Sequence, residues 1–214
     1  MNSTMKPWLS AYPEGVPAEI DITAYSSLVD LMQESFRQYG DRTAFSFLGR
    51  GLSYKELDRL SQVFAAYLQS LGLVFGDRVA IMLPNVLQYP IAVAAVLRAG
   101  FVVVNINPLY TARELEAQLK DADAKAIVVL ENFGATLQDC LAHTPIKHVV
   151  LCAMGDRLGW LKGTLVNHVV RNIKKMSSLH KIAVICKAWK FYRSNKKVTQ
   201  FGWDSVKEAF PKPI

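Results

Sequence analysis

The hydrophobic positions of residues 77–110 form two short continuous runs with a helical stretch between them. Arg78 to Leu83 is rich in β-forming residues and stops at Pro84, as expected of a strand buried on both faces. Ile91 to Arg98 is almost entirely apolar and long enough for a buried helix. Phe101 to Val104 is the second apolar run. A strand, a buried helix and another strand in this order predict a parallel sheet.

Capping signals place the ends of the helices. We assign Asn85 as the cap of the central helix, and Gly100 as the left-handed residue that ends it. The strings SYKE and TARE each have the form of a capping box, in which a hydroxyl and a glutamate satisfy each other's backbone amides. The boxes comprise Ser53 with Glu56, and Thr111 with Glu114.

The same alternation continues on both sides of the central unit. The patterns predict a helix from Leu28 to near Gly40, a hairpin over 43–52, a helix from Tyr54 to about Leu71, a helix from Thr111 to about Asp121, a strand Ala126–Leu130, a helix Phe133–Ala142 and a strand Val149–Ala153. Together they predict an α/β fold, a doubly wound and mostly parallel sheet with flanking helices. The expected core contains Val79, Ile81, Leu83, Val93, Val96, Val102, Val104, Ile127 and Val129.

The string NINPLY follows the second strand of the central unit. Ligands of open parallel sheets bind beyond the carboxyl ends of the strands, so Asn105, Asn107 and Tyr110 are candidate substrate-adjacent residues. The alternative is a plain asparagine–proline turn that prepares the helix capped by Thr111. We favour the turn, because such turns are common where no ligand binds.

Charge divides the chain into an acidic body and a basic segment. Residues 1–156 contain 12 Lys and Arg against 16 Asp and Glu, whereas residues 157–203 contain 11 Lys and Arg and no acid. We therefore expect three parts: an N-terminal arm and helix over 1–41, the α/β subdomain over 42–156, and a basic amphipathic helical segment over 157–214.

Within the basic segment, one helical face is apolar, formed by Leu161, Leu165, Val169, Val170, Ile173 and Met176. Basic and aromatic residues without acids suit an anionic membrane surface. The candidate membrane contacts are Lys162, Arg171, Lys174, Lys175, Lys181, Lys187, Trp189 and Lys190. An exposed helix packed on the body explains the pattern equally well. Nucleic acid is not expected, since no RNA-binding or helix-turn-helix motif accompanies the charge.

Several classes of chemistry find no support in the residue pattern. The three cysteines are scattered and the four histidines have no partners at ligand spacing, so no metal site and no disulfide is expected. We find no nucleophile elbow and no glycine-rich phosphate loop, and no catalytic residue is assigned. No signal peptide and no transmembrane stretch is visible, which favours the cytoplasm.

Several long strings carry a resemblance to a known family. PNVLQYP, AVLRAG and VVVNINPLYTARELEAQLKDADAKAIVV, in this order, resemble the N-terminal part of AMP-forming acyl-CoA synthetases. The opening WLSAYPEGVPAEID and the later string GDRLGWLKGTLVNHVVRNIKK are similar to long-chain fatty-acid–CoA ligases of that family. More narrowly, the chain resembles the N-terminal part of bacterial long-chain fatty-acid–CoA ligases up to about Lys181. The resemblance implies an enzyme that activates a carboxylate with ATP and Mg²⁺ and then transfers the acyl group to CoA.

The family's Ser/Thr/Gly-rich phosphate loop and its later motifs do not occur in the chain. The resemblance therefore implies the first subdomain of a ligase, inactive alone and binding no cofactor tightly. The alternative is a free-standing, non-catalytic homologue that binds a membrane surface or a protein. For the whole enzyme we expect a long-chain fatty acid as substrate and a location in the cytoplasm or at the inner membrane. A homo-oligomer stays open.

Overall fold

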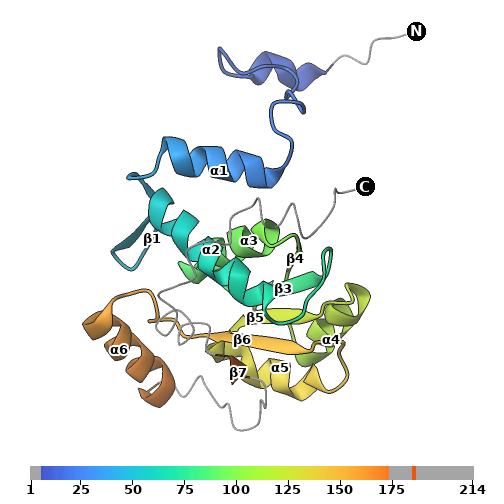
Figure 1. Cartoon of the computed structure of the whole chain (residues 1–214), viewed down its shortest axis with the longest axis vertical. Helices are drawn as coiled ribbons and strands as arrows, with labels where there is room; N and C mark the ends of the chain where they lie inside the picture. The colour runs from blue at the N-terminus through green and yellow to red at the C-terminus, as the bar shows by residue number, and fades with distance from the viewer. Residues whose placement is uncertain (1–5, 174–184, 187–214) are drawn as a thin grey trace.

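The structure is a computed structural model, and it describes residues 6–173 and 185–186 of the chain (Figure 1). Its centre is a parallel sheet in the order β4-β3-β5-β6-β7. The strands are β3 (Arg78–Met82), β4 (Val102–Asn105), β5 (Ala126–Leu130), β6 (His148–Cys152) and β7 (Ile185–Cys186). All four pairings between neighbouring strands are parallel, which confirms the predicted α/β fold.

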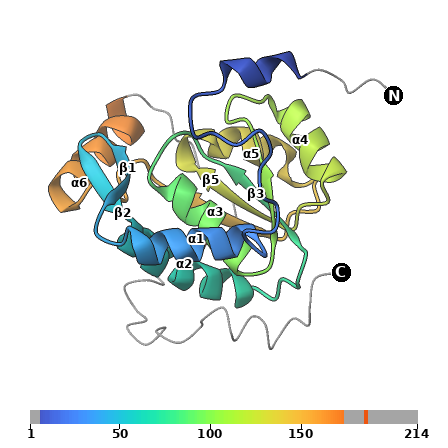
Figure 2. The same ribbon diagram turned by 90° about the horizontal axis from the view of Figure 1, so that it is seen from above.

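Helices cover both faces of the sheet, as Figure 2 shows. They are α1 (Leu28–Gln38), α2 (Tyr54–Gln69), α3 (Gln88–Arg98), α4 (Ala112–Asp121), α5 (Gly134–Leu141) and α6 (Trp160–His168), with a π-helical turn over Val169–Ile173. Successive side chains of β3 point to opposite faces. Val79 and Ile81 pack with α2 and α3. Ala80 and Met82 pack with α4 and α5.

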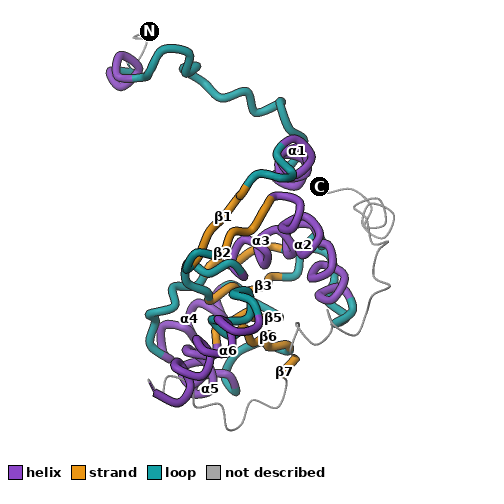
Figure 3. Tube along the Cα trace, turned by 90° about the vertical axis from the view of Figure 1, so that its left-hand side faces the viewer, coloured by secondary structure: helices purple, strands orange, loops and turns teal. Residues whose placement is uncertain are grey.

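A two-stranded hairpin and an N-terminal arm complete the described residues. The hairpin, β1 (Thr43–Phe47) and β2 (Arg50–Ser53), is antiparallel as predicted and turns at Leu48 and Gly49, which both have positive φ. The arm contains one 3-10 turn, Pro7–Ala11, and is irregular from there to α1. It reaches away from the body (Figures 1 and 3).

The capping predictions hold at two positions. Thr111 and Glu114 form both halves of the capping box at the start of α4. Gly100 has a φ of +81° directly after α3, a conformation that glycine adopts at little cost.

The capping predictions are wrong in part at two other positions. Asn85 is exposed and caps nothing, because a tight turn from Val86 N to Pro84 O comes before α3, which begins only at Gln88. Ser53 does cap α2 through the amide of Glu56. The Glu56 carboxylate, however, pairs with Arg157 instead of completing the box.

The expected core is wrong at one strand. Val102 is 46% exposed and Val104 only partly buried, because β4 lies at the edge of the sheet. Val93 is also partly buried, whereas the other six expected core residues are buried. A continuous apolar run therefore indicates a strand but does not distinguish a central strand from an edge strand.

The basic segment differs from its predicted form in two respects. The single apolar face that was expected is divided, because Val170 is only 6% exposed whereas Leu161 and Leu165 are 74% and 63% exposed. Ile185 and Cys186, expected within a helical segment, form β7 beside β6. The remaining residues from 174 to 214 lie outside the described part of the chain.

Candidate functional site: the carboxyl edge of the sheet

The strands of a parallel sheet end at one common edge, where the loops of β3, β4, β5 and β6 meet. The chain passes from β3 outward to β4 and then crosses to β5 on the other side of β3. The strand order therefore reverses between β3 and β5, at the point where open α/β sheets bind ligands. We take this carboxyl edge as the candidate functional site.

The NINPLY loop forms one end of the edge. Asn105 closes β4, and its Oδ1 accepts a hydrogen bond from Tyr89 Oη at 3.1 Å. Asn107 Oδ1 accepts from Leu109 N at 3.0 Å, and its carbonyl accepts from Tyr110 N. Asn107 thus forms the turn that the sequence favours. Contact of these residues with a substrate stays a prediction.

Glu131 lies at the switch point, directly after β5. It is only 6% exposed; its two carboxylate oxygens share the single N–H of Arg171 Nε at 3.0 Å, and Oε2 also accepts from Arg171 Nη2 at 2.8 Å. These bonds raise the pKa of Arg171. Sequence reasoning missed Glu131, although a glutamate that ends the apolar string AIVVL is a usable signal.

A second carboxylate follows β6. Burial raises the pKa of Asp156 above its ordinary value of 3.8, although Oδ2 accepts a hydrogen bond from Ala153 N at 2.8 Å. The charge of Glu131 raises this pKa further, and that of Arg171 lowers it. Beside them, burial raises the pKa of the Cys152 thiol to about 12, so this thiol is unreactive at neutral pH.

Helix α6 docks on this edge through small and polar residues. A Cβ atom on Gly163 would lie 2.3 Å from Gly155 O, so the two glycines bring the helix and the loop after β6 into direct contact. Asn167 Oδ1 accepts from Gly155 N at 2.7 Å. Lys162 Nζ donates to Leu48 O, which joins α6 to the hairpin beside it in Figures 1 and 2.

The opposite side of α6 is apolar and exposed. Trp160 is 80% exposed, and a hollow of about 310 Å³ is lined by Trp160, Leu161, Thr164, Leu165 and His168. Of the candidate membrane residues, Lys162 and Arg171 have the intramolecular partners given above. Lys174, Lys175, Lys181, Lys187, Trp189 and Lys190 lie outside the described residues.

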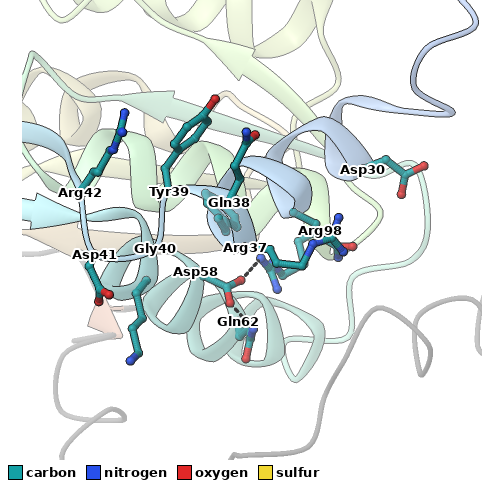
Figure 4. A pocket seen from close by; sticks show the side chains of 13 residues that line it. Asp30, Arg37, Gln38, Tyr39, Gly40, Asp41, Arg42, Asp58, Gln62 and Arg98 are labelled. Carbon is teal, nitrogen blue, oxygen red and sulfur yellow. Dashed lines mark hydrogen bonds and ion pairs between the residues drawn. The ribbon is translucent and has the colours of Figure 1, made fainter.

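A larger polar hollow of about 780 Å³, drawn in Figure 4, is lined by residues from α1, α2 and the end of α3. At one side Arg98, 4% exposed, pairs with Asp58 at 2.5 Å, and Asp58 also accepts from Gln62. The Arg98 guanidinium lies 5.7 Å from the centre of the Phe36 ring. Sequence reasoning missed this pair. It links three helices, and its residues are engaged with one another.

Three backbone amides at the carboxyl edge are not free to bind a nucleotide triphosphate. Such a group needs free backbone amides or several cations. The amides of Leu109 and Ala153 are already bonded to side chains of their own loops, and the amide of Gly155 is bonded to Asn167 of α6. Among residues 6–173 and 185–186, no group of three or more metal-ligating side chains could hold an ion. None of the helices described is long and apolar enough to cross a membrane.

The fold resembles that of solved CoA ligases. It matches a long-chain-fatty-acid–CoA ligase from Archaeoglobus fulgidus with a TM-score of 0.55, at 23% identity, over 71% of this chain and 30% of that one. It also matches an anthranilate CoA ligase in complex with anthranoyl-AMP with a TM-score of 0.56, at 19% identity, over 65% and 26%. At these identities the likeness shows the fold of adenylate-forming ligases.

Sequence comparison then shows the family. The family model of AMP-binding enzymes matches residues 32–191, and the chain belongs to that family. It is 52% identical over 172 residues to the long-chain-fatty-acid–CoA ligase of Escherichia coli O157:H7 and 53% identical over 172 residues to that of Yersinia pestis. Each match covers 80% of this chain and 31% of the relative. The chain thus corresponds to the N-terminal part of such ligases and spans about a third of their length.

Proposed function

We propose that the chain forms the N-terminal part of an ATP-dependent, AMP-forming ligase that joins long-chain fatty acids to CoA. The carboxylate attacks the α-phosphate of ATP with Mg²⁺ present, giving acyl-AMP and pyrophosphate. The CoA thiol then displaces AMP to form the thioester. The observation that carries the proposal is the 52% identity over 172 residues to a relative with this name. Asn105, Asn107 and Tyr110 would form part of the wall around the acid.

A chimera tests this proposal. The matching segment of the Escherichia coli O157:H7 ligase is replaced by the aligned 172 residues of this chain, and ATP–pyrophosphate exchange is measured with long-chain, medium-chain and aromatic acids. The chimera should show exchange that depends on a long-chain acid, whereas the relative without the segment should show none. A folded chimera that is inactive with every acid would contradict the proposal.

The chain alone should show no exchange with any fatty acid. The amides of Ala153 and Gly155 at its carboxyl edge are bonded to its own side chains, and the phosphate loop of the family does not occur in its sequence. A pure preparation with exchange that depends on a fatty acid would disprove this prediction.

We also propose that the part after residue 157 contacts an anionic membrane at the cytoplasmic face. The exposed apolar side of α6 supports this second role, as does the excess of cations in residues 157–203. Each lysine near an anionic leaflet contributes roughly 1 kcal/mol, an effect that decays over a Debye length of about 10 Å at 0.1 M salt. The same contact would suit the alternative, a non-catalytic homologue.

Vesicle co-sedimentation tests the membrane proposal. The chain should bind vesicles with anionic lipid more than neutral vesicles and should dissociate as salt rises. Leu165→Ser combined with Lys174→Gln and Lys175→Gln should weaken binding, with Arg171 kept because of its ion pair. Leu109→Ser is the control, since Leu109 is 84% exposed but lies on the NINPLY loop. Equal sedimentation with both kinds of vesicle would contradict the proposal.

A further inference from the structure

The side of α6 that faces the body carries almost no apolar surface. Gly163 and Asn167 lie one turn apart in α6, and Val170 and Arg171 follow in the π-helical turn after it. Of these, only Val170 is a buried hydrophobic residue. Gly163 contacts Gly155, and Asn167 accepts from the Gly155 amide. The docking of α6 therefore rests on close backbone contact and on polar bonds.

Arg171 makes the most extensive of these bonds. Its side chain, about half exposed, reaches from the turn after α6 to the carboxylate of Glu131, which is buried. Glu131 stands at the switch point of the sheet, and Asp156 lies close enough to add its charge. A buried carboxylate that loses its partner costs more than the bond itself contributes. Removal of Arg171 should therefore favour movement of Glu131 toward water and loosening of α6.

Two further bonds hold the start of the helix but do not reach the carboxyl edge. Lys162 bonds to the hairpin carbonyl of Leu48, and Arg157, before the helix, pairs with Glu56 of α2. Arg171 thus fixes the turn that directly follows α6, and its partner belongs to the candidate site itself.

We propose that Arg171 and Glu131 form a latch that holds α6 on the carboxyl edge of the sheet with its apolar side outward, and that both act as positioning residues for the ligase reaction. The effect on catalysis rests on the proposed function, whereas the docking of α6 does not.

Hydrogen exchange of the chain tests the docking. Arg171→Met should speed exchange of the α6 amides by roughly tenfold or more, as expected for a lost charge-assisted hydrogen bond, and leave α4 unchanged. Glu131→Gln should act in the same direction. The double variant should exchange little faster than either single variant, because both remove one interaction. Arg113→Met, which removes an exposed arginine of α4, is the control.

Three results would overturn the latch. One is α6 exchange that is unchanged in Arg171→Met. Another is single effects that simply add in the double variant. The third is an equal loss of protection in α4 and α6, which would mean that the pair stabilises the whole fold. Arg171→Lys keeps the charge without the two-pronged geometry and should recover part of the α6 protection.

The chimera tests the effect on catalysis. Arg171→Met should lower its kcat, and Arg171→Lys should restore part of it. A kcat equal to that of the unsubstituted chimera, despite faster α6 exchange, would rule out the positioning role. If the unsubstituted chimera is itself inactive, the proposed function fails, while the exchange experiment on the chain still decides whether the latch exists.

Discussion

Helices α3 and α6 border the same sheet, but α3 packs its apolar side against the body and α6 packs its polar side. Helix α3 buries Ala92, Ala95 and Val96 against the α/β body. Helix α6 buries only Gly163 and leaves Trp160 and Leu161 to water. The apolar side of a helix is thus not always the side that packs on its own subdomain: in α3 it is, and in α6 it is not.

The two helices differ in what stabilises their positions. Burial of apolar area contributes roughly 25 cal/mol per Å², so α3 is held by many small contacts that are lost only when the body unfolds. The position of α6 depends on a few directional bonds and one glycine contact. We expect α6 to open separately from the body, at a lower free energy.

The largest expected difference comes from one substitution made in both regions. Leu83→Ala, at a residue 5% exposed beside the end of β3, should lower the free energy of unfolding by about 2–5 kcal/mol. Leu165→Ala, on the outer side of α6, should change it by less than about 0.5 kcal/mol. Urea denaturation of both variants measures the difference. Equal losses would show that the outer side of α6 is packed in solution.

A smaller effect is expected at the glycine contact. Gly163→Ala places a Cβ atom against Gly155 O, and overpacking of this kind costs about 1–3 kcal/mol. Hydrogen exchange should therefore be faster in α6 and unchanged in α3. Thr164→Ala, one residue along on the exposed side, is the matched control. Because alanine favours helix, an α6 that becomes more protected in Gly163→Ala would mean that the close contact does not form.

Most of the body could be predicted because its signals are local. Continuous apolar runs located β3, β5 and β6, and the hydroxyl–glutamate spacing located the start of α4. Val102 was misplaced because strand order, which no local pattern contains, puts β4 at the edge.

The candidate site was predictable only in part. NINPLY could be placed at the carboxyl edge because it follows a strand directly. Glu131 and Arg171 are 40 residues apart, as are Asp58 and Arg98, and neither pair has a periodic signature that would connect them. The contact of Gly155 with Gly163 likewise depends on the angle at which the chain leaves β6. These features follow from tertiary geometry, which overrides local propensity.

The smallest expected effect is a pH dependence of the stability that comes from Asp156, in the loop before α6. Because the pKa of Asp156 is raised above 3.8, the folded state holds more protons than the unfolded state between these two pKa values. The stability that Asp156 contributes should therefore decrease as pH rises through this window, and stay constant above it. Asp156→Asn should remove that decrease. Since the charge of Arg171 lowers this pKa, Arg171→Met should extend the window to higher pH. Arg171→Met combined with Asp156→Asn should lose the window. Urea denaturation at a series of pH values, with each variant compared to the parent, measures the slope. If the free energy of unfolding of the parent and of Asp156→Asn changed with pH in parallel, Asp156 would be hydrated, and the loop before α6 would be open to water.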